Sequence, residues 1–287
     1  MSLLLQGVIS GLLLGGVYGL ISIGLALIFG VMRIVNFAHG DLVMLAMYCA
    51  FFLITLGHFN PYLTLVLVMP VLFIVGVVIE RGLIKRSFGQ PESNQLVLTA
   101  AISLLLENVA LLAFSPTAQS AVTSYKLIEL GPVFVNQAQL YGFVIALAAT
   151  ALLAFLLRFT EAGRALRATV ADPVMATMLG VNINRMRTLA FGIGAALTGV
   201  AGVVLATYYP VSPTVGLGFL IVAFVAVVMG GMTSIAGTFA SALIVGIAQQ
   251  VTASLGAAQI QNITVFVIFI LMLLLRPQGL FSRRSRA

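Results

Sequence analysis

The chain has 287 residues, of which 61% are hydrophobic and only 7% are charged. A soluble domain carries charge on about a quarter of its residues, so this composition excludes the soluble classes and indicates a protein whose surface faces lipid. The formal net charge is +7. The basic residues gather beside apolar runs, which is typical of membrane orientation signals rather than of nucleic-acid binding. The single cysteine, Cys49, excludes an intrachain disulfide.

Apolar runs follow one another along the whole chain, and they are continuous rather than alternating, which favours helices over strands. Because a helix needs about 20 apolar residues to cross a bilayer, we predict an all-α polytopic membrane protein with eight or nine transmembrane helices. One or two segments are expected to be broken or re-entrant, and residues 1–287 to form a single transmembrane domain. The runs are 3–31, 42–56, 62–79, 95–114, 140–157, 189–208, 217–229, 235–248 and 260–275.

Basic residues concentrate in three links of the chain, at 80–92, 158–187 and 276–287. Cytoplasmic loops of membrane proteins are enriched in Lys and Arg, so we expect these links, and with them the C-terminus, in the cytoplasm. The link 115–138 contains one lysine and one glutamate and is expected outside. The number of runs then predicts that the N-terminus also lies outside.

Two polar or glycine-rich breaks interrupt the apolar sequence, RIVNFAHGD at 33–41 and GGMTSIAG at 230–237. Non-helical backbone at membrane depth is tolerated only where it is buried in protein or lines a water-filled cavity. Transporters often place such breaks in corresponding halves of the chain. Both breaks are therefore candidates for the surroundings of a solute path.

The first run carries Gly7, Gly11, Gly15 and Gly19 at four-residue spacing. A line of glycines on one helix face lets another helix approach closely. We favour packing within the chain as the interpretation. The alternative is that this face contacts a second copy or a related permease subunit.

Few polar side chains within the apolar runs could act on a solute. His39 and Asp41 lie two residues apart after Asn36, and Glu107 lies deep in the run 95–114. These four are the candidates for a translocation path, since an ionisable group at membrane depth is costly. The simpler interpretation of the first pair is that Asp41 caps the following helix and His39 packs in the protein. A nucleophile and a metal-ligand set are both missing beside them, so an enzyme is not expected.

The link 158–187 contains two predicted helices. Glu161, Arg164 and Arg167 recur every three residues and form one charged helix face. Asp172 and Pro173 then have the residue types of a helix N-cap and first position. The second helix ends at a glycine suited to a C-terminal cap. The residues of this capped segment are Asp172, Pro173, Val174, Met175, Ala176, Met178, Leu179 and Gly180.

The capped helix has an apolar ridge made by Val174, Met175, Met178 and Leu179. Such a ridge on a short helix suits a groove on a partner protein, with methionine as an adaptable contact. The sequence alone leaves a position on the membrane interface as an equal alternative.

The chain lacks the Gly-Lys-Ser/Thr of a nucleotide-binding loop. Its two lysines are Lys85, which follows Ile84, and Lys126, which follows Tyr125. We therefore expect no ATP site in this chain, so that any ATP and Mg²⁺ would be bound by a partner.

Three stretches of the chain together resemble the LivH-like permease subunits of branched-chain amino acid ABC importers. They are GLLLGGVYGLISIGLALIFGVMRIVNFAHGDLVMLAMY at 11–48, TEAGRALRATVADPVMATMLGVN at 160–182 and VMGGMTSIAGTFASALIVGI at 228–247. The resemblance implies a bacterial inner-membrane complex of two homologous permeases, two cytoplasmic ATPases and a periplasmic binding protein. It also implies leucine, isoleucine and valine as cargo, although similar architectures carry urea, short amides or other amino acids.

ABC importers of the wider family dock a cytoplasmic E-A-A-x-x-x-G helix into the ATPase. The matching positions here keep only Ala176 and Gly180 of that pattern, which puts the details of the contact in doubt. The resemblance nevertheless favours ATPase docking for the apolar ridge. A self-sufficient secondary carrier or channel is the alternative class, and it would be expected to show several carboxylates at mid-membrane.

Overall fold

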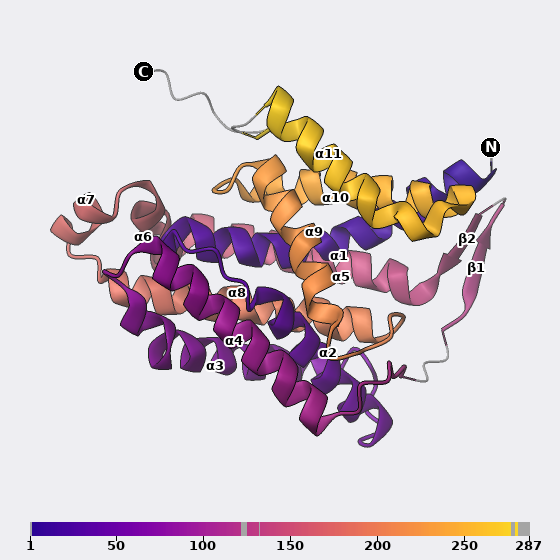
Figure 1. Cartoon of the computed structure of the whole chain (residues 1–287), viewed down its shortest axis with the longest axis horizontal. Helices are drawn as coiled ribbons and strands as arrows, with labels where there is room; N and C mark the ends of the chain where they lie inside the picture. The colour runs from indigo at the N-terminus through magenta and orange to yellow at the C-terminus, as the bar shows by residue number, and fades with distance from the viewer. Residues whose placement is uncertain (1, 122–124, 132, 277–278, 281–287) are drawn as a thin grey trace.

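The computed structural model describes residues 2–121, 125–131, 133–276 and 279–280 (Figure 1). Arg283, Arg284 and Arg286 of the tail, which entered the prediction of a cytoplasmic C-terminus, lie outside the described residues. The helices are α1 (Ser2–Met32), α2 (His39–Thr55), α3 (Thr64–Gly82), α4 (Glu92–Ala113), α5 (Gln137–Phe159), α6 (Glu161–Ala171), α7 (Pro173–Met178), α8 (Ile183–Ala206), α9 (Val215–Gly230), α10 (Ile235–Thr252) and α11 (Gln261–Leu275).

Each of the predicted apolar runs coincides with a helix, because continuous apolar sequence can satisfy its backbone in lipid only by internal hydrogen bonds. In the described ranges six helical stretches are long and apolar enough to cross a membrane. One of them is the stretch Ile235–Leu275, which contains both α10 and α11. The helices α2 and α9 are apolar but shorter. A helical membrane fold is therefore present, while the number of eight or nine crossings stays a prediction.

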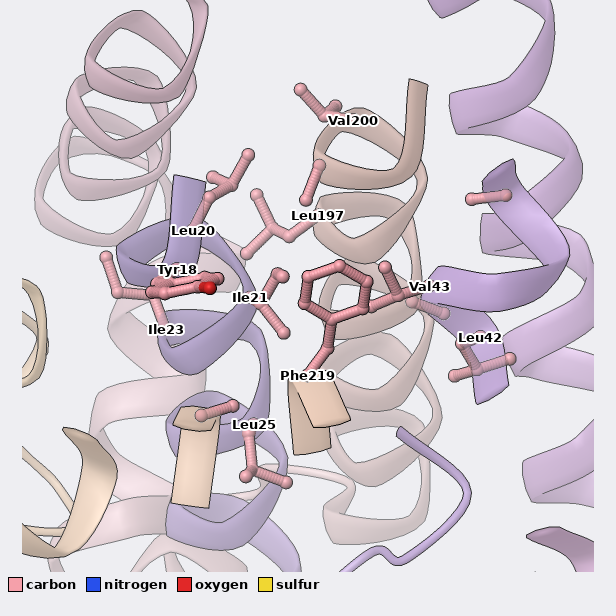
Figure 2. Packing of buried hydrophobic residues seen from close by; sticks show 14 of the residues in the cluster. Tyr18, Leu20, Ile21, Ile23, Leu25, Leu42, Val43, Leu197, Val200 and Phe219 are labelled. Atoms are coloured by element: carbon pink, nitrogen blue, oxygen red, sulfur yellow. The ribbon is translucent and has the colours of Figure 1, made fainter. Parts of the chain in front are cut away.

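The helices α1 and α8 form the centre of the bundle. In each, 89% of the apolar span is buried inside the chain, against 17% for α4. Side chains of Ile21, Val43, Leu197 and Phe219 meet in the core, where α1, α2, α8 and α9 come together (Figure 2). The large exposed apolar surface of α3, α4 and α5 is what lipid or another membrane subunit would cover.

A close approach of α1 and α10 explains the glycine line of the first run. A Cβ atom built at Gly11 would lie 2.5 Å from the Cα of Ile247, and one at Gly15 would lie 2.9 Å from the Cα of Leu243. Gly7 and Gly19 face α10 and the turn after it in the same way. The glycine face is therefore filled by this chain itself, which agrees with the favoured interpretation, and the alternative of a second subunit on this face is wrong.

A β-hairpin departs from the all-α prediction. Strands β1 (Leu127–Leu130) and β2 (Val133–Asn136) pair antiparallel in the link that was expected outside the membrane. The hairpin lies at the end of the molecule that also holds the N-terminus (Figure 1). Its buried valines, Val133 and Val135, pack on Leu13 of α1. Each strand is only four residues long, so a search for long apolar runs passes over it.

The break at 33–41 folds back into the bundle. After α1 ends, residues 33–38 lead to α2, whose first residue, His39, contacts the carbonyl of Ile21. Ile21 precedes the end of α1 by 11 residues, which is about 16 Å along a helix. The hydroxyl of Thr99 donates to the carbonyl of Val35 at 3.1 Å and holds the returning segment. The helix α2 thus begins beside the body of α1 rather than beyond its end, and a re-entrant segment here stays a prediction.

The second break is a tight turn between α9 and α10. Gly231 has φ +89°, a conformation that favours glycine. Ser234 then caps α10 by accepting a hydrogen bond from the backbone N–H of Gly237 at 3.1 Å. The backbone of Gly230 packs directly against Thr238, so the turn is compact and leaves no room for a larger side chain there.

Candidate functional site

The charged helix α6 begins with a side-chain cap. Thr160 accepts a hydrogen bond from the N–H of Gly163 at 3.0 Å. Glu161 and Arg164 lie 3.9 Å apart and are mostly exposed, so their pairing contributes at most about 1 kcal/mol. Arg167 instead donates to the carbonyl of Arg158 at 3.5 Å. The predicted charged face therefore exists, but its arginines have different partners.

The helix α7 starts as the sequence predicts. The Asp172 carboxylate accepts hydrogen bonds from the N–H groups of Val174 and Met175 at 2.8 and 3.0 Å. Pro173 is the first helical residue, where its missing N–H costs nothing. Gly180 has φ +82° just after the helix. Local capping thus fixes both ends of a helix that is too short to be stable by itself.

The apolar ridge of α7 faces outward. Val174, Met175, Met178 and Leu179 are 62%, 58%, 76% and 82% exposed, whereas Ala176 on the opposite side is buried. Figure 1 shows α7 at the far end of the molecule from the hairpin. Four adjacent apolar side chains are therefore exposed on and just after a capped helix, and exposed apolar patches of this kind are typical of surfaces that contact a partner or the membrane interface.

A buried polar contact ties α8, which follows α7, to α3. The Thr188 hydroxyl donates to the Glu80 carboxylate at 2.7 Å, and Glu80 is only 1% exposed. The neighbouring Arg187 guanidinium lies 4.2 Å from the ring centroid of Phe88, which is within cation–π range. Sequence reasoning missed Glu80, although a carboxylate at the end of an apolar run, directly before Arg81, is a recognisable signal.

The structure separates His39 from Asp41. His39 is fully buried, and its Nε2 donates to the carbonyl of Ile21 at 2.9 Å, as the packing interpretation expected. The prediction that Asp41 caps α2 was wrong, because α2 has no side-chain cap. Asp41 instead accepts a hydrogen bond from the hydroxyl of Ser103 at 2.5 Å. Asn36 serves the turn before α2 by accepting from the N–H of Ala38 at 3.2 Å.

Glu107 comes close enough to Asp41 for the two charges to interact. It lies one helical turn beyond Ser103 on α4, so that face of α4 carries both groups toward α2. Two of the four path candidates, Asp41 and Glu107, therefore lie on the contacting helices α2 and α4, while His39 contacts α1 and Asn36 stays in its turn. Their part in moving a solute remains a prediction.

The long apolar helices define a multi-pass helical membrane protein. Residues 7–275 match the family described as branched-chain amino acid transport system / permease component. The chain is 32% identical to the high-affinity branched-chain amino acid transport system permease protein BraD of Pseudomonas aeruginosa, over 97% of this chain and 96% of the relative. It is 31% identical to the permease protein LivH of Escherichia coli K12, over 97% and 96% of the two chains.

A more distant relative comes from an archaeon. The probable branched-chain amino acid transport permease protein LivH of Methanocaldococcus jannaschii is 30% identical, over 91% of this chain and 87% of the relative. The chain therefore belongs to the family of branched-chain amino acid transport system permease components.

Proposed function

We propose that this chain is the permease subunit of an ATP-driven importer that carries branched-chain amino acids across the inner membrane. The relatives BraD and LivH are permease proteins of branched-chain amino acid transport systems, which supports this cargo. The observation that carries the proposal is α7, a capped helix with four exposed apolar side chains. We place α7 on the cytoplasmic side, because the neighbouring α6 and the end of α5 carry arginines; the basic residues of the tail favour the same side for the C-terminus.

The partners in this proposal are a second permease, two cytoplasmic ATPases and a periplasmic binding protein. ATP and Mg²⁺ bind to the ATPases, since this chain lacks the nucleotide loop described above. The binding protein selects the cargo and delivers it, so the permease requires only weak contacts with the solute. An exposed apolar ridge with two methionines fits a groove on the ATPase surface.

The helix α7 is directly connected to the membrane helices, so a displacement of α7 can be passed on to them. The helix α7 is followed by Asn182, which caps α8 by accepting from the N–H of Arg185 at 3.1 Å. The helix α8 is central in the bundle and is attached to α3 through Thr188 and Glu80. A displacement of α7 by the ATPases would therefore shift α8 and α3 together, as expected for rigid elements that share a packed interface.

The test is a charge placed on the ridge. In Met178→Asp, a carboxylate would have to be desolvated on docking, so we expect loss of ATPase co-purification and of ATP-dependent leucine uptake. Thr177→Asp is the matched control, since Thr177 is exposed on α7 but lies off the ridge. Normal assembly and uptake in Met178→Asp would refute the docking role.

A secondary carrier is the second candidate, and the Asp41–Glu107 pair favours it. Two carboxylates near each other in the apolar region could exchange protons during transport. This candidate predicts leucine uptake by the chain alone, driven by a pH gradient and abolished in Asp41→Asn. Uptake that depends entirely on the ATPases would exclude it.

A further inference from the structure

A cavity of about 750 Å³ opens at the end of the bundle that holds α6. It lies between α1, α5, α6 and α10, and its lining is mostly apolar. Small residues make the room, among them Ala26 and Gly30 of α1 and Ala151 and Ala154 of α5, while Phe239 of α10 forms part of the opposite wall. The volume falls in the range of about 300–1,000 Å³ found for small-molecule sites.

The charged groups among the described lining residues of the cavity are basic. Arg158 and Arg167 line it at the end where α5 meets α6, and none of the described lining residues is acidic. Thr233 and the first residue of α10 line the same end. The N-terminus of this 18-residue helix directs its partial positive charge toward the same region. The chain thus supplies an anion-binding end to an otherwise aliphatic cavity.

The wall also contains an unsatisfied hydroxyl group. Thr150 lines the cavity from α5, and its Oγ1 is covered and has no hydrogen-bond partner among the described residues. A threonine in a helix usually bonds the carbonyl one turn before it, as Thr252 does here at 2.9 Å. Thr150 is therefore a buried hydroxyl in the cavity wall that lacks the usual intrahelical partner among the described residues.

We propose that this cavity is the solute site of the permease, and that it binds an aliphatic molecule through its carboxylate. The carboxylate lies between Arg158, Arg167 and the start of α10, and the hydrocarbon part lies against the alanines of α5. This inference rests on the proposed transport function and adds to it the location and the chemistry of recognition. Because the lining offers no acidic partner, the ammonium group of an amino acid contributes little to binding.

This proposal gives the break at 230–237 a function in the cavity. The break brings the start of α10 to the cavity, which Arg158 in the last turn of α5 also lines. A continuous helix through 230–237 would have no free N–H groups there.

Site-directed labelling tests the cavity in the assembled transporter. The single cysteine Cys49 is first replaced by alanine, and then Ala151→Cys is exposed from the cytoplasmic side to sulfonatoethyl methanethiosulfonate. We expect labelling, because the reagent requires a thiol in contact with water. Ala148→Cys is the matched control, since Ala148 is exposed on the same helix but does not line the cavity.

Protection by solutes identifies the chemistry that is recognised. Millimolar L-leucine and 4-methyl-2-oxopentanoate, which share the carboxylate, should both slow labelling at Ala151→Cys. L-Leucinamide, which lacks the carboxylate, should not slow it, and Ala148→Cys, which lies outside the cavity on the outer face of α5, should remain unlabelled with or without the solutes. In the same background, Arg167→Gln should raise the half-protecting concentration of leucine about threefold to tenfold through loss of a charge-assisted contact.

Arg164→Gln is the control for Arg167→Gln, since Arg164 lies on α6 outside the cavity. Absence of labelling at Ala151→Cys, or labelling that leucine and leucinamide slow equally, would overturn the inference. So would equal half-protecting concentrations in the two arginine variants. These failures would leave the proposed function intact if the parent transporter still takes up leucine with ATP. Loss of the proposed function would appear as absence of that uptake in the parent itself.

Discussion

The contact of α1 with α10 can be tested by adding a single methyl group. Gly11→Ala places a Cβ atom 2.5 Å from the Cα of Ile247 and 2.7 Å from the carbonyl oxygen of Gly246. Carbon atoms pack best at about 3.5–4.0 Å, so the new atom is about 1 Å too close. Its neighbours are backbone atoms, which cannot turn aside as a side chain would. The two helices must therefore separate, and the contacts along the interface loosen.

The magnitude follows from two opposing effects. Overpacking of this kind destabilises by about 1–3 kcal/mol, while alanine stabilises a helix by about 1 kcal/mol relative to glycine. Gly218→Ala is the matched control, because Gly218 lies inside α9 and nothing lies within 4 Å of its added Cβ. The propensity gain is shared by the two variants, so their difference isolates the overpacking cost of about 1–3 kcal/mol.

Chemical unfolding in mixed micelles measures this difference. The chain has no tryptophan, so helix loss is followed by circular dichroism rather than by tryptophan fluorescence. We expect Gly218→Ala to unfold at or slightly above the denaturant concentration of the parent, and Gly11→Ala clearly below it. Two variants that unfold within about 0.5 kcal/mol of each other would show that the helices are not in backbone contact, and the reasoning would be refuted.

Three further substitutions test local features. Asp172→Ala removes a cap worth about 1 kcal/mol and should increase amide exchange in α7 and lower ATPase stimulation, whereas Asp172→Asn should retain most of both. Thr188→Val leaves the Glu80 carboxylate without its hydroxyl donor and should destabilise the bundle by about 1–3 kcal/mol; an unchanged unfolding midpoint would contradict this. Gln6 pairs with both backbone groups of Phe134, at 2.8 and 2.9 Å, so Gln6→Leu should speed amide exchange there, and unchanged protection would refute the attachment.

The sequence determined the features that depend on neighbouring residues. Lipid admits only internally hydrogen-bonded backbone, so each long apolar run had to become a helix. The ends of α7 were predictable because Asp172, Pro173 and Gly180 act within a few residues of themselves. The break at 33–41 was recognisable for the same reason, since polar residues and a glycine interrupt an apolar run locally.

Tertiary structure alone decided which distant groups meet. Asp41 was expected to cap its own helix, but its carboxylate accepts a hydrogen bond from the hydroxyl of Ser103, which lies 62 residues away in the sequence. The hydrogen-bond partner of Glu80 is the hydroxyl of Thr188, which lies 108 residues away in the sequence. The glycine line of α1 predicted that another helix packs closely against it, but did not identify that helix as α10. Spacing along a chain fixes which face of a helix a residue occupies, but the partner of that face depends on how all the helices pack together.

The candidate solute site shows the same division. The arginines of 158–187 and the break at 230–237 were visible as polar sequence, yet no pattern placed them around one cavity. That cavity exists because small side chains of α1 and α5 leave space where α6 and α10 converge. Composition and local pattern thus determined a helical membrane protein with a capped amphipathic helix, and the resemblance to a family supplied the permease role. Only the packing of the helices decided where a solute could bind. A cavity is the space left between several helices, so the sequence of any one helix does not specify it.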